Sequence, residues 1–492
     1  MTTRKSLLAG TILGVAALAT TPALAQTTAR SAAPATPAPA PAATAAQVDA
    51  LNKQIQALQS QLDGLKSQVD KDIKAVDKRV ADAPTVTVAN GRPRIQSADK
   101  AFDFALTTRV HLDYGWWFPD QGITTDLPDG FNVRRAFLGI TGTAFKDWGY
   151  NITFDFSGRA NSSGRVQNIG ISYNGIKNWA FDIGAFQPSF TLMDSISSND
   201  IPFIERSQTT NIAVTHVSGP EARTAVGFRH WGERYRVSAY LTGQQIGQTA
   251  GGTNDDQASG IVRASFLAAT DKEYDVHFGL NYGYMWEPGS NATPGPTNYS
   301  LSDRPETRIG GLGATGLGFS TGNINTDNLA VYGGEFGASF KSFWTMAEYY
   351  RNDFEQKGGP DVDFDTWYVA AGYILTGERR PYSVAAGNFG SPRVASPFGV
   401  GGGMGLWELA VRYSVADLTD AGVATGGSTT SAAAILNRAL QGEQKVWTFG
   451  VNWYANAAVR FMANYNMAKI DRPAGATDTE VDALTLRAQF AF

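Results

Sequence analysis

The sequence predicts an all-β protein: a 16-stranded antiparallel transmembrane β-barrel preceded by a signal peptide and a short N-terminal coiled-coil helix. Three observations lead to this prediction. Residues 101–492 alternate apolar and polar side chains with a period of two, which is the pattern of strands whose two faces meet different surroundings. The alternating segments are even in number. Short and long connections alternate between them, as periplasmic turns and outer loops do in an outer-membrane barrel.

The chain begins with the features of a secretory signal peptide. Arg4 and Lys5 precede an apolar run over 7–19, and Ala23-Leu-Ala25 is a cleavage motif, so we expect residues 1–25 to be removed. The apolar run is shorter than the roughly 20 residues that a membrane-spanning helix needs. Residues 26–46 are rich in Ala, Pro and Thr and predict a semi-rigid linker.

Residues 47–82 predict an amphipathic helix. Its apolar residues recur at alternating spacings of three and four, which is a heptad seam, and the opposite faces are mostly polar. This favours a coiled coil, and so an oligomer, over a helix that lies on a domain. Val or Ile at one seam position with Leu at the other nominally favours two strands, so the seam leaves the number of chains open. The seam consists of Val48, Leu51, Ile55, Leu58, Leu62, Leu65 and Val69, and after a one-residue stutter of Ile73, Val76 and Val80.

After a second predicted linker at 83–100, the barrel domain is predicted over 101–492. The segment 274–286 shows the pattern clearly, because one face carries aromatic residues at both ends and aliphatic residues in the middle. That arrangement is typical of an outer face that crosses a bilayer between two aromatic girdles. The predicted strands are 101–117, 131–144, 149–157, 166–174, 179–186, 223–231, 234–243, 258–268, 274–286, 329–340, 343–352, 365–376, 405–415, 445–454, 457–467 and 481–492, the last of which ends at Phe492.

One connection departs from the alternation of turns and loops. The connection 377–404 is long where a short turn is expected. Either a strand boundary is misplaced there, or the periplasmic rim carries an insertion. Soluble alternatives fit less well, because a β-sandwich seldom uses such long strands so regularly and a propeller would show a repeat of blades.

Composition argues against catalysis and against nucleic-acid binding. Cysteine is absent, and the four histidines are dispersed without metal-ligand spacing, so we expect no cofactor, no metal site and no enzymatic activity. The formal charge is −4 and would become −6 after loss of the two basic residues in 1–25. This modest negative charge excludes nucleic acid as the expected partner.

Several stretches together carry a family resemblance. They are Arg134-Arg-Ala-Phe-Leu-Gly-Ile-Thr-Gly142 with Asp147-Trp-Gly149, Ser198-Asn-Asp-Ile-Pro-Phe-Ile-Glu-Arg-Ser207, Leu375-Thr-Gly-Glu-Arg-Arg-Pro-Tyr382, Trp407-Glu-Leu-Ala-Val-Arg-Tyr413 and Gly450-Val-Asn-Trp-Tyr454. With the coiled coil ahead of them, they resemble the phosphate-selective porin O and P family of trimeric outer-membrane channels. The chain has Gln187 where that family usually carries a lysine, so phosphate selectivity does not follow from the resemblance.

The resemblance implies an outer-membrane porin in the bacterial outer membrane. Such a protein forms a water-filled channel for passive diffusion of small hydrophilic solutes, here anions such as phosphate. Its expected surroundings are outer-membrane lipid and two further copies of the chain in a homotrimer. The alternative is an envelope-tethering or adhesin-like structural outer-membrane protein, in which the coiled coil and the long loops do the work.

Arginines on the polar faces of the strands are the candidate pore-lining residues. A lipid-facing arginine near the midplane would cost roughly 2–4 kcal/mol, which directs these side chains to the lumen. They could pass an anion from site to site. Alternatively, they could pair with the eight carboxylates that share the inward-facing side of the strands and only keep the interior hydrated. The nine candidates are Arg109, Arg135, Arg229, Arg234, Arg236, Arg263, Arg412, Arg460 and Arg487.

The third long loop, 187–222, is the expected constriction. The resemblance implies that it folds into the barrel, whereas an ordinary extracellular loop is the alternative. Its charged or titratable candidates are Asp194, Asp200, Glu205, Arg206 and His216.

Overall fold

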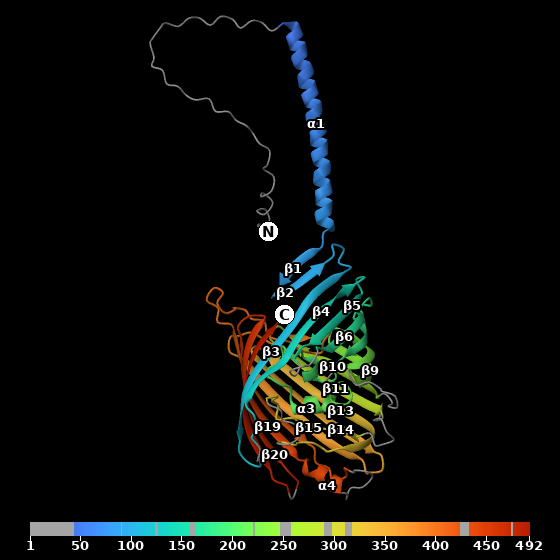
Figure 1. Ribbon diagram of the computed structural model, residues 1–492, viewed down its shortest axis with the longest axis vertical. Helices are drawn as coiled ribbons and strands as arrows, with labels where there is room; N and C mark the ends of the chain where they lie inside the picture. Colours follow the sequence, from blue (N-terminus) through green and yellow to red (C-terminus); the bar gives the residue numbers. More distant parts are fainter. Residues whose placement is uncertain are drawn as a thin grey trace, which may run out of the picture. The chain divides into compact units, whose positions relative to one another are not determined.

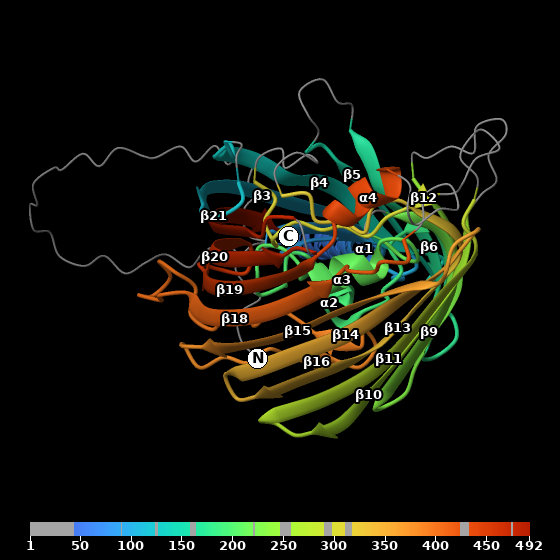
Figure 2. The same cartoon turned by 90° about the horizontal axis from the view of Figure 1, so that it is seen from below.

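Sixteen antiparallel strands close into a barrel in the computed structural model (Figures 1 and 2). The structure describes residues 44–89, 91–123, 126–157, 164–219, 222–246, 257–289, 298–309, 317–423, 432–473 and 476–492. The last strand pairs with the first, which leaves no open edge. The barrel strands are β3 (Asp103–Pro119), β4 (Gly130–Ala144), β5 (Trp148–Asp155), β6 (Arg165–Tyr173), β7 (Trp179–Phe186), β8 (Arg223–Trp231), β9 (Tyr235–Gln245), β10 (Ala258–Thr270), β11 (Tyr274–Glu287), β13 (Ile324–Phe340), β14 (Phe343–Gln356), β15 (Val362–Ile374), β18 (Leu406–Asp417), β19 (Glu443–Tyr454), β20 (Val459–Asp471) and β21 (Thr479–Ala491).

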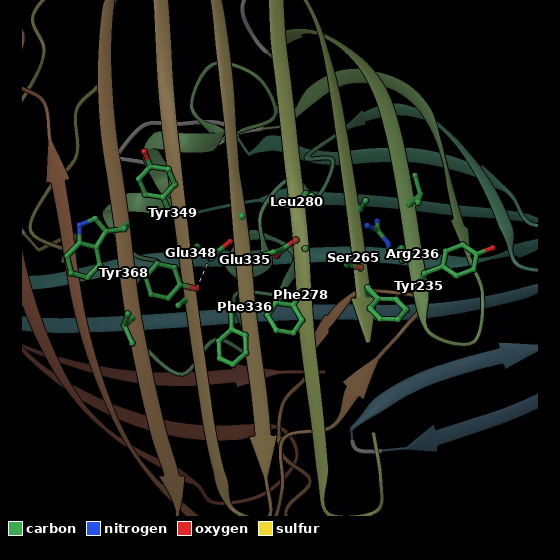
Figure 3. A pocket seen from close by; sticks show the side chains of 18 residues that line it. Tyr235, Arg236, Ser265, Phe278, Leu280, Glu335, Phe336, Glu348, Tyr349 and Tyr368 are labelled. Atoms are coloured by element: carbon green, nitrogen blue, oxygen red, sulfur yellow. Dashed lines mark hydrogen bonds between the residues drawn. The ribbon is translucent and has the colours of Figure 1, made fainter. Parts of the chain in front are cut away.

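All sixteen predicted strands are confirmed, with boundaries that shift by a few residues. The largest shift is in β13, which begins at Ile324 rather than at residue 329. Side chains alternate as predicted: Phe278 is half exposed on the outer face, whereas Glu335 on the neighbouring strand is buried inside. Figure 3 shows the rings of Phe278 and Phe336 together on one side of β11 and β13, over an apolar groove in the outer wall.

Three connections fold into the barrel and fill much of its interior. The first is 187–222, with α2 (Leu192–Ser195) and α3 (Gln208–Val214), which lie within the ring of strands in Figure 2. The second is 288–323, of which 288–289, 298–309 and 317–323 are described, with β12 (Asn298–Tyr299). The third is 375–405, with the short strands β16 (Tyr382–Ser383) and β17 (Asn388–Phe389). A fourth connection carries α4 (Ala432–Ala439).

Apolar side chains of these connections pack against the inner wall. Phe190 of the first and Leu301 of the second share a buried cluster with Tyr350 of β14. Leu192 of the first and Phe389 of the third share another with Trp344. The inner faces of β14 to β20 are therefore covered by protein. The inner faces of β4 to β6 stay largely half-buried, so the open space lies along that wall.

The long connection 377–404 is an insertion, and no strand boundary is misplaced there. It enters the barrel from the rim of short turns. Arg380 makes two hydrogen bonds of 2.8 and 2.9 Å to the buried carboxylate of Glu408. Asn388 donates to Ser195 Oγ of the first connection at 3.2 Å, and Gly387 O accepts from Arg263 Nη2 at 2.7 Å. The insertion thus contacts the connection 187–222 from the side of the short turns and helps to fix its position.

The expected linker at 83–100 contains a β-hairpin, which corrects that prediction. Strand β1 (Thr85–Ala89) pairs with β2 (Arg92–Gln96), and β2 pairs with the first residues of β3. The last residue, Phe492, exchanges two backbone hydrogen bonds with Thr108 of β3. The hairpin therefore occupies the edge of β3 beyond the point where the final strand ends. Sequence alone missed it, because its alternation spans only about five residues per strand.

The helix α1 (Ala45–Asp82) begins two residues before its predicted start. Its seam residues are exposed in the single chain, with Leu58 and Leu65 each 64% exposed. The coiled coil therefore stays a prediction. The predicted signal peptide and most of the linker at 26–46 lie outside the described residues. None of the described helices combines the length and the apolarity that crossing a membrane would need.

We expect Arg487→Met to destabilise the barrel by about 3–5 kcal/mol, because it leaves the buried carboxylate of Asp113 without its ion-pair partner. Arg487 Nε and Nη2 donate to Asp113 at 2.6 and 2.7 Å across the closing strand pair, and Nη2 also donates to Glu205 at 3.0 Å. Unfolding in urea, followed in detergent by tryptophan fluorescence, measures the effect. Lys341→Met, which removes an exposed ion pair with Glu273, is the control and should change little. Equal loss in both variants would contradict the expectation.

Candidate pore constriction

A cavity of about 740 Å³ lies between the wall formed by β3 to β6 and the inserted connections. Strands supply Arg109, Arg135 and Asp155; the connection 187–222 supplies Asp194 and Ser195 to Ser198. Because most of its lining is polar, this cavity suits water and hydrophilic solutes. Altogether seven arginines line this arginine cavity: Arg109, Arg134, Arg135, Arg165, Arg206, Arg304 and Arg308.

A β-bulge brings two consecutive arginines into this cavity. His111 of β3 pairs with Arg135 and the next residue, Leu112, pairs with Val133, so Arg134 is the extra residue of β4. Arg134 then reaches inward and donates from Nε and Nη2 to the two carboxylate oxygens of Glu205 at 2.8 and 3.1 Å. In a regular strand neighbouring side chains point to opposite faces, so without the bulge only one of Arg134 and Arg135 would face the cavity.

The cavity carries an excess of positive charge. Seven guanidinium groups face three carboxylates, those of Asp155, Asp194 and Glu205, which leaves a formal charge of +4 when all are ionised. Among the described residues, Arg109 donates only to the hydroxyls of Ser198 and Ser197, at 2.7 and 3.0 Å. In the described chain, no carboxylate lies within ion-pair distance of Arg109 or Arg135.

The two carboxylates of the inserted connection have opposite pKa shifts. Burial alone would raise the pKa of Glu205, but Arg134, Arg135 and Arg487 hold this pKa well below its usual range. Burial raises the pKa of Asp194, and the more distant Arg206 and Arg263 only partly oppose this. Glu205 is therefore a fixed negative charge, whereas Asp194 gains a proton more readily than an ordinary aspartate.

Of the nine predicted pore-lining arginines, the structure places two in the arginine cavity, Arg109 and Arg135. Arg229 lines a second cavity and is paired with Asp182. Arg234 is exposed in the turn before β9, which corrects its placement on a strand. The other five are buried and bonded to carboxylates, hydroxyls or carbonyls within the barrel: Arg236, Arg263, Arg412, Arg460 and Arg487.

Of the five candidates in the connection 187–222, three line the arginine cavity: Asp194, Glu205 and Arg206. Asp200 instead lies near Arg380 and Arg460 in the filled part of the barrel. His216 is half-buried, with Nε2 3.0 Å from Ser300 O and its ring against Tyr299.

Sequence reasoning missed Arg134, Arg165, Arg304 and Arg308. Alternation along a strand places only one of two adjacent arginines on the inner face, and nothing in the sequence indicates the bulge that places both Arg134 and Arg135 there. Arg304 and Arg308 belong to the connection 288–323, and that this loop also enters the barrel was not expected.

A second cavity of about 350 Å³, which we call the amide cavity, adjoins the first, because Gln187 lines both. It lies against β4 to β8 on the side of the short turns. Its charged residues are Asp182 and Arg229, which form a double hydrogen bond of 2.8 Å each, so the pair is neutral. Gln187 itself donates to Asp194 Oδ1 at 2.6 Å.

A closed barrel with an apolar outer face, a polar interior and loops folded into its lumen defines an outer-membrane porin, a channel for small solutes. Residues 104–492 match the family described as phosphate-selective porin O and P, and the chain belongs to this family. Its place is therefore the bacterial outer membrane.

Among curated proteins, the chain is 26% identical over 441 residues to Porin O of Pseudomonas aeruginosa, covering 83% of this chain and 93% of that protein. It is 24% identical over 395 residues to an uncharacterised protein of Caulobacter vibrioides, covering 79% of this chain and 72% of that protein. Among solved structures, an anion-selective porin from Comamonas acidovorans is 11% identical with a TM-score of 0.47 over 80% of this chain and 100% of its own. The outer-membrane channel DcaP of Acinetobacter baumannii is 13% identical, with a TM-score of 0.47 over 80% of this chain and 98% of its own.

We expect acidification to increase the preference of the channel for anions. The raised pKa of Asp194 means that this group is neutralised first as the pH falls from about 7 towards 4. Its protonation raises the formal charge of the arginine cavity from +4 to +5. Reversal potentials in a potassium chloride gradient at several pH values measure the change.

Asp194→Asn is the matched control, because it removes the titrating charge and keeps an acceptor for Gln187. This variant should prefer anions strongly already at neutral pH and lose most of the pH dependence. A shift towards cations in the unmodified protein at low pH would contradict the expectation.

Proposed function

We propose that this porin passes small anions such as phosphate by passive diffusion, with the arginine cavity as its selective constriction. The observation that carries the proposal is the excess of seven arginines over three carboxylates in the lining. A cation that enters meets net repulsion, and an anion meets net attraction that low-dielectric walls strengthen. We expect no catalytic step and no energy coupling.

Arg109 and Arg135 are the arginines that we propose to contact the passing anion. They come from the neighbouring strands β3 and β4 of the wall, and Arg109 donates to Ser197 and Ser198 of the inserted connection. Because no carboxylate in the described chain lies within ion-pair distance of Arg109 or Arg135, both can donate charge-assisted hydrogen bonds to a phosphate or carboxylate. The hydroxyls of Ser197 and Ser198 offer weaker hydrogen bonds from the other side, which allows the anion to leave.

The filled half of the barrel explains why solutes would take this path. The inserted connections cover the inner faces of β14 to β20, where Trp344, Tyr350 and Tyr368 are fully buried. The wall of β4 to β6 keeps half-buried polar side chains instead. A solute that crosses the barrel is thereby directed past Arg109 and Arg135.

The double variant Arg109→Ala with Arg135→Ala should lower the ratio of anion to cation permeability by roughly three- to tenfold, or about 0.7–1.4 kcal/mol. Reversal potentials in planar bilayers with a salt gradient measure this ratio. Arg234→Ala is the matched control, because it removes an arginine from an exposed turn outside the cavity. A cation-favouring potential in the unmodified protein would overturn the proposed function.

We further propose that three copies of the chain assemble as a homotrimer through α1. A heptad seam that is exposed in one chain is buried when helices of several chains pack together. The number three rests on the family resemblance, since the seam itself does not fix it.

Leu58→Asp with Leu65→Asp should shift the trimer towards smaller species, because it places charges at the same position of two adjacent heptads of the seam. Chemical cross-linking in detergent and native gel mobility report the assembly. Ser60→Asp with Ser67→Asp adds the same charges at outward positions and should leave the assembly intact. Unchanged cross-linking of the seam variant would contradict the role of α1.

A further inference from the structure

The amide cavity differs in chemistry from the arginine cavity that it adjoins. Its only charged pair, Asp182 and Arg229, is neutral and further held by Ser172 and Tyr240, whose hydroxyls both donate to Asp182. The remaining polar lining consists mainly of side-chain amides and hydroxyls, including those of Asn151 and Asn168. This cavity therefore offers neutral hydrogen-bonding groups rather than charge.

Small residues create the space in this cavity. One row of cross-strand neighbours runs through Thr141, Asn151, Gly170, Gly184 and Ala225 on five adjacent strands. A methyl group added at Gly170 would meet its nearest atoms, Asn168 Oδ1 and a ring carbon of Phe186, at 3.8 Å. The space above Gly170 is thus bounded by an amide oxygen and an aromatic ring.

Two acceptors at this cavity lack a donor within the part of the chain that the structure describes. Asn151 Oδ1 and Asn168 Oδ1 are buried and accept no hydrogen bond in the described chain. A buried acceptor without a partner is destabilising, so these oxygens favour a ligand that brings donors. Carboxylates only accept hydrogen bonds and inorganic phosphate has only one or two P–O–H donors, whereas a polyhydroxylated molecule brings several hydroxyl groups that donate and can also accept from the amide nitrogens.

The two cavities are close enough for one molecule to contact both. Asn168 lies three residues from Arg165 on β6, which is about 10 Å along the strand, and the arginine side chain shortens the gap. Gln187, whose side chain lines both cavities, stands between them without a charge. An anionic group in the first cavity can therefore be joined to hydroxyl groups in the second.

We propose that the paired cavities bind a polyhydroxylated anion, a sugar phosphate or sugar acid, with its charged group among the arginines and its hydroxyls at Asn151 and Asn168. The aromatic side chains of Phe186 and Tyr240, which pack edge to face with centroids 5.8 Å apart, give the carbon face of a sugar an apolar contact. This inference rests on the proposed anion path and specifies which anions are held most tightly.

Block of single-channel chloride current in planar bilayers tests the inference. The probes are glucose 6-phosphate, inorganic phosphate and glucose. In the unmodified protein, glucose 6-phosphate should reduce the current at a concentration about tenfold lower than phosphate needs, and glucose should be weaker than both. Equal half-blocking concentrations of the two anions, or block by glucose as strong as by glucose 6-phosphate, would overturn the inference.

Variants assign the effect to the amide cavity. Asn151→Ala with Asn168→Ala should raise the half-blocking concentration of glucose 6-phosphate about tenfold and leave that of phosphate unchanged. Gly170→Val, which fills the hollow without removing an amide, should do the same and keeps the test open if the double variant does not insert. Gln167→Ala is the matched control, because it removes an amide from the same strand at the arginine cavity. If the control matches the double variant, the assignment is wrong.

Reversal potentials recorded in the same membranes separate this inference from the proposed function. An anion-favouring potential together with equal block by the two anions leaves the anion path standing and overturns the sugar-phosphate inference. A cation-favouring potential overturns both.

Discussion

The interior of this barrel depends on buried arginines whose charges are neutralised by carboxylates. A ring of sixteen strands is wider than its own side chains can fill, so the space is either packed by other segments or left to water. Arg380 with Glu408 and Arg412 with Glu306 join inserted connections to the wall, each with both side chains fully buried. Arg487 does so at the closing strand pair, between Asp113 and Glu205. Because an unpaired buried charge is costly, these pairs fix where each connection can lie.

This use of arginine creates two electrostatic environments in one lumen. On the side of β14 to β20, the guanidinium groups pair with carboxylates and donate to backbone carbonyls, and the inserted connections fill the lumen. On the side of β3 to β6, seven arginines meet three carboxylates across a cavity. Glu205 belongs to both sides, since it accepts from Arg134 at the cavity and from Arg487 in the packed part. The carboxylate of Glu205 therefore has two effects. It anchors the connection 187–222 to the wall, and it reduces the excess of positive charge in the arginine cavity.

The strand pattern could be predicted because lipid and lumen impose opposite requirements on alternate residues. A lipid face must be apolar at every second position, so all sixteen strands are visible in the sequence. The contents of the lumen could not be predicted, because they depend on contacts between segments far apart in the chain. The sequence of the loop that contains Arg304 and Glu306 has no feature that predicts its entry into the barrel. The contact between Glu306 and Arg412 is visible only in the folded chain. The bulge that turns Arg134 inward likewise depends on the register between β3 and β4.

The neutral side chain at Gln187 has a consequence for how an anion would leave the arginine cavity. Conduction needs a site that is attractive enough to enter but weak enough to leave. A cation at this junction would extend the attraction of the arginines towards the amide cavity. Gln187 instead donates to Asp194, and the next charges along the path, Asp182 and Arg229, cancel each other. Under the proposed function, the positive potential would therefore fall over one short step, and hydrogen bonds to neutral groups beyond that step would decide which anions are retained.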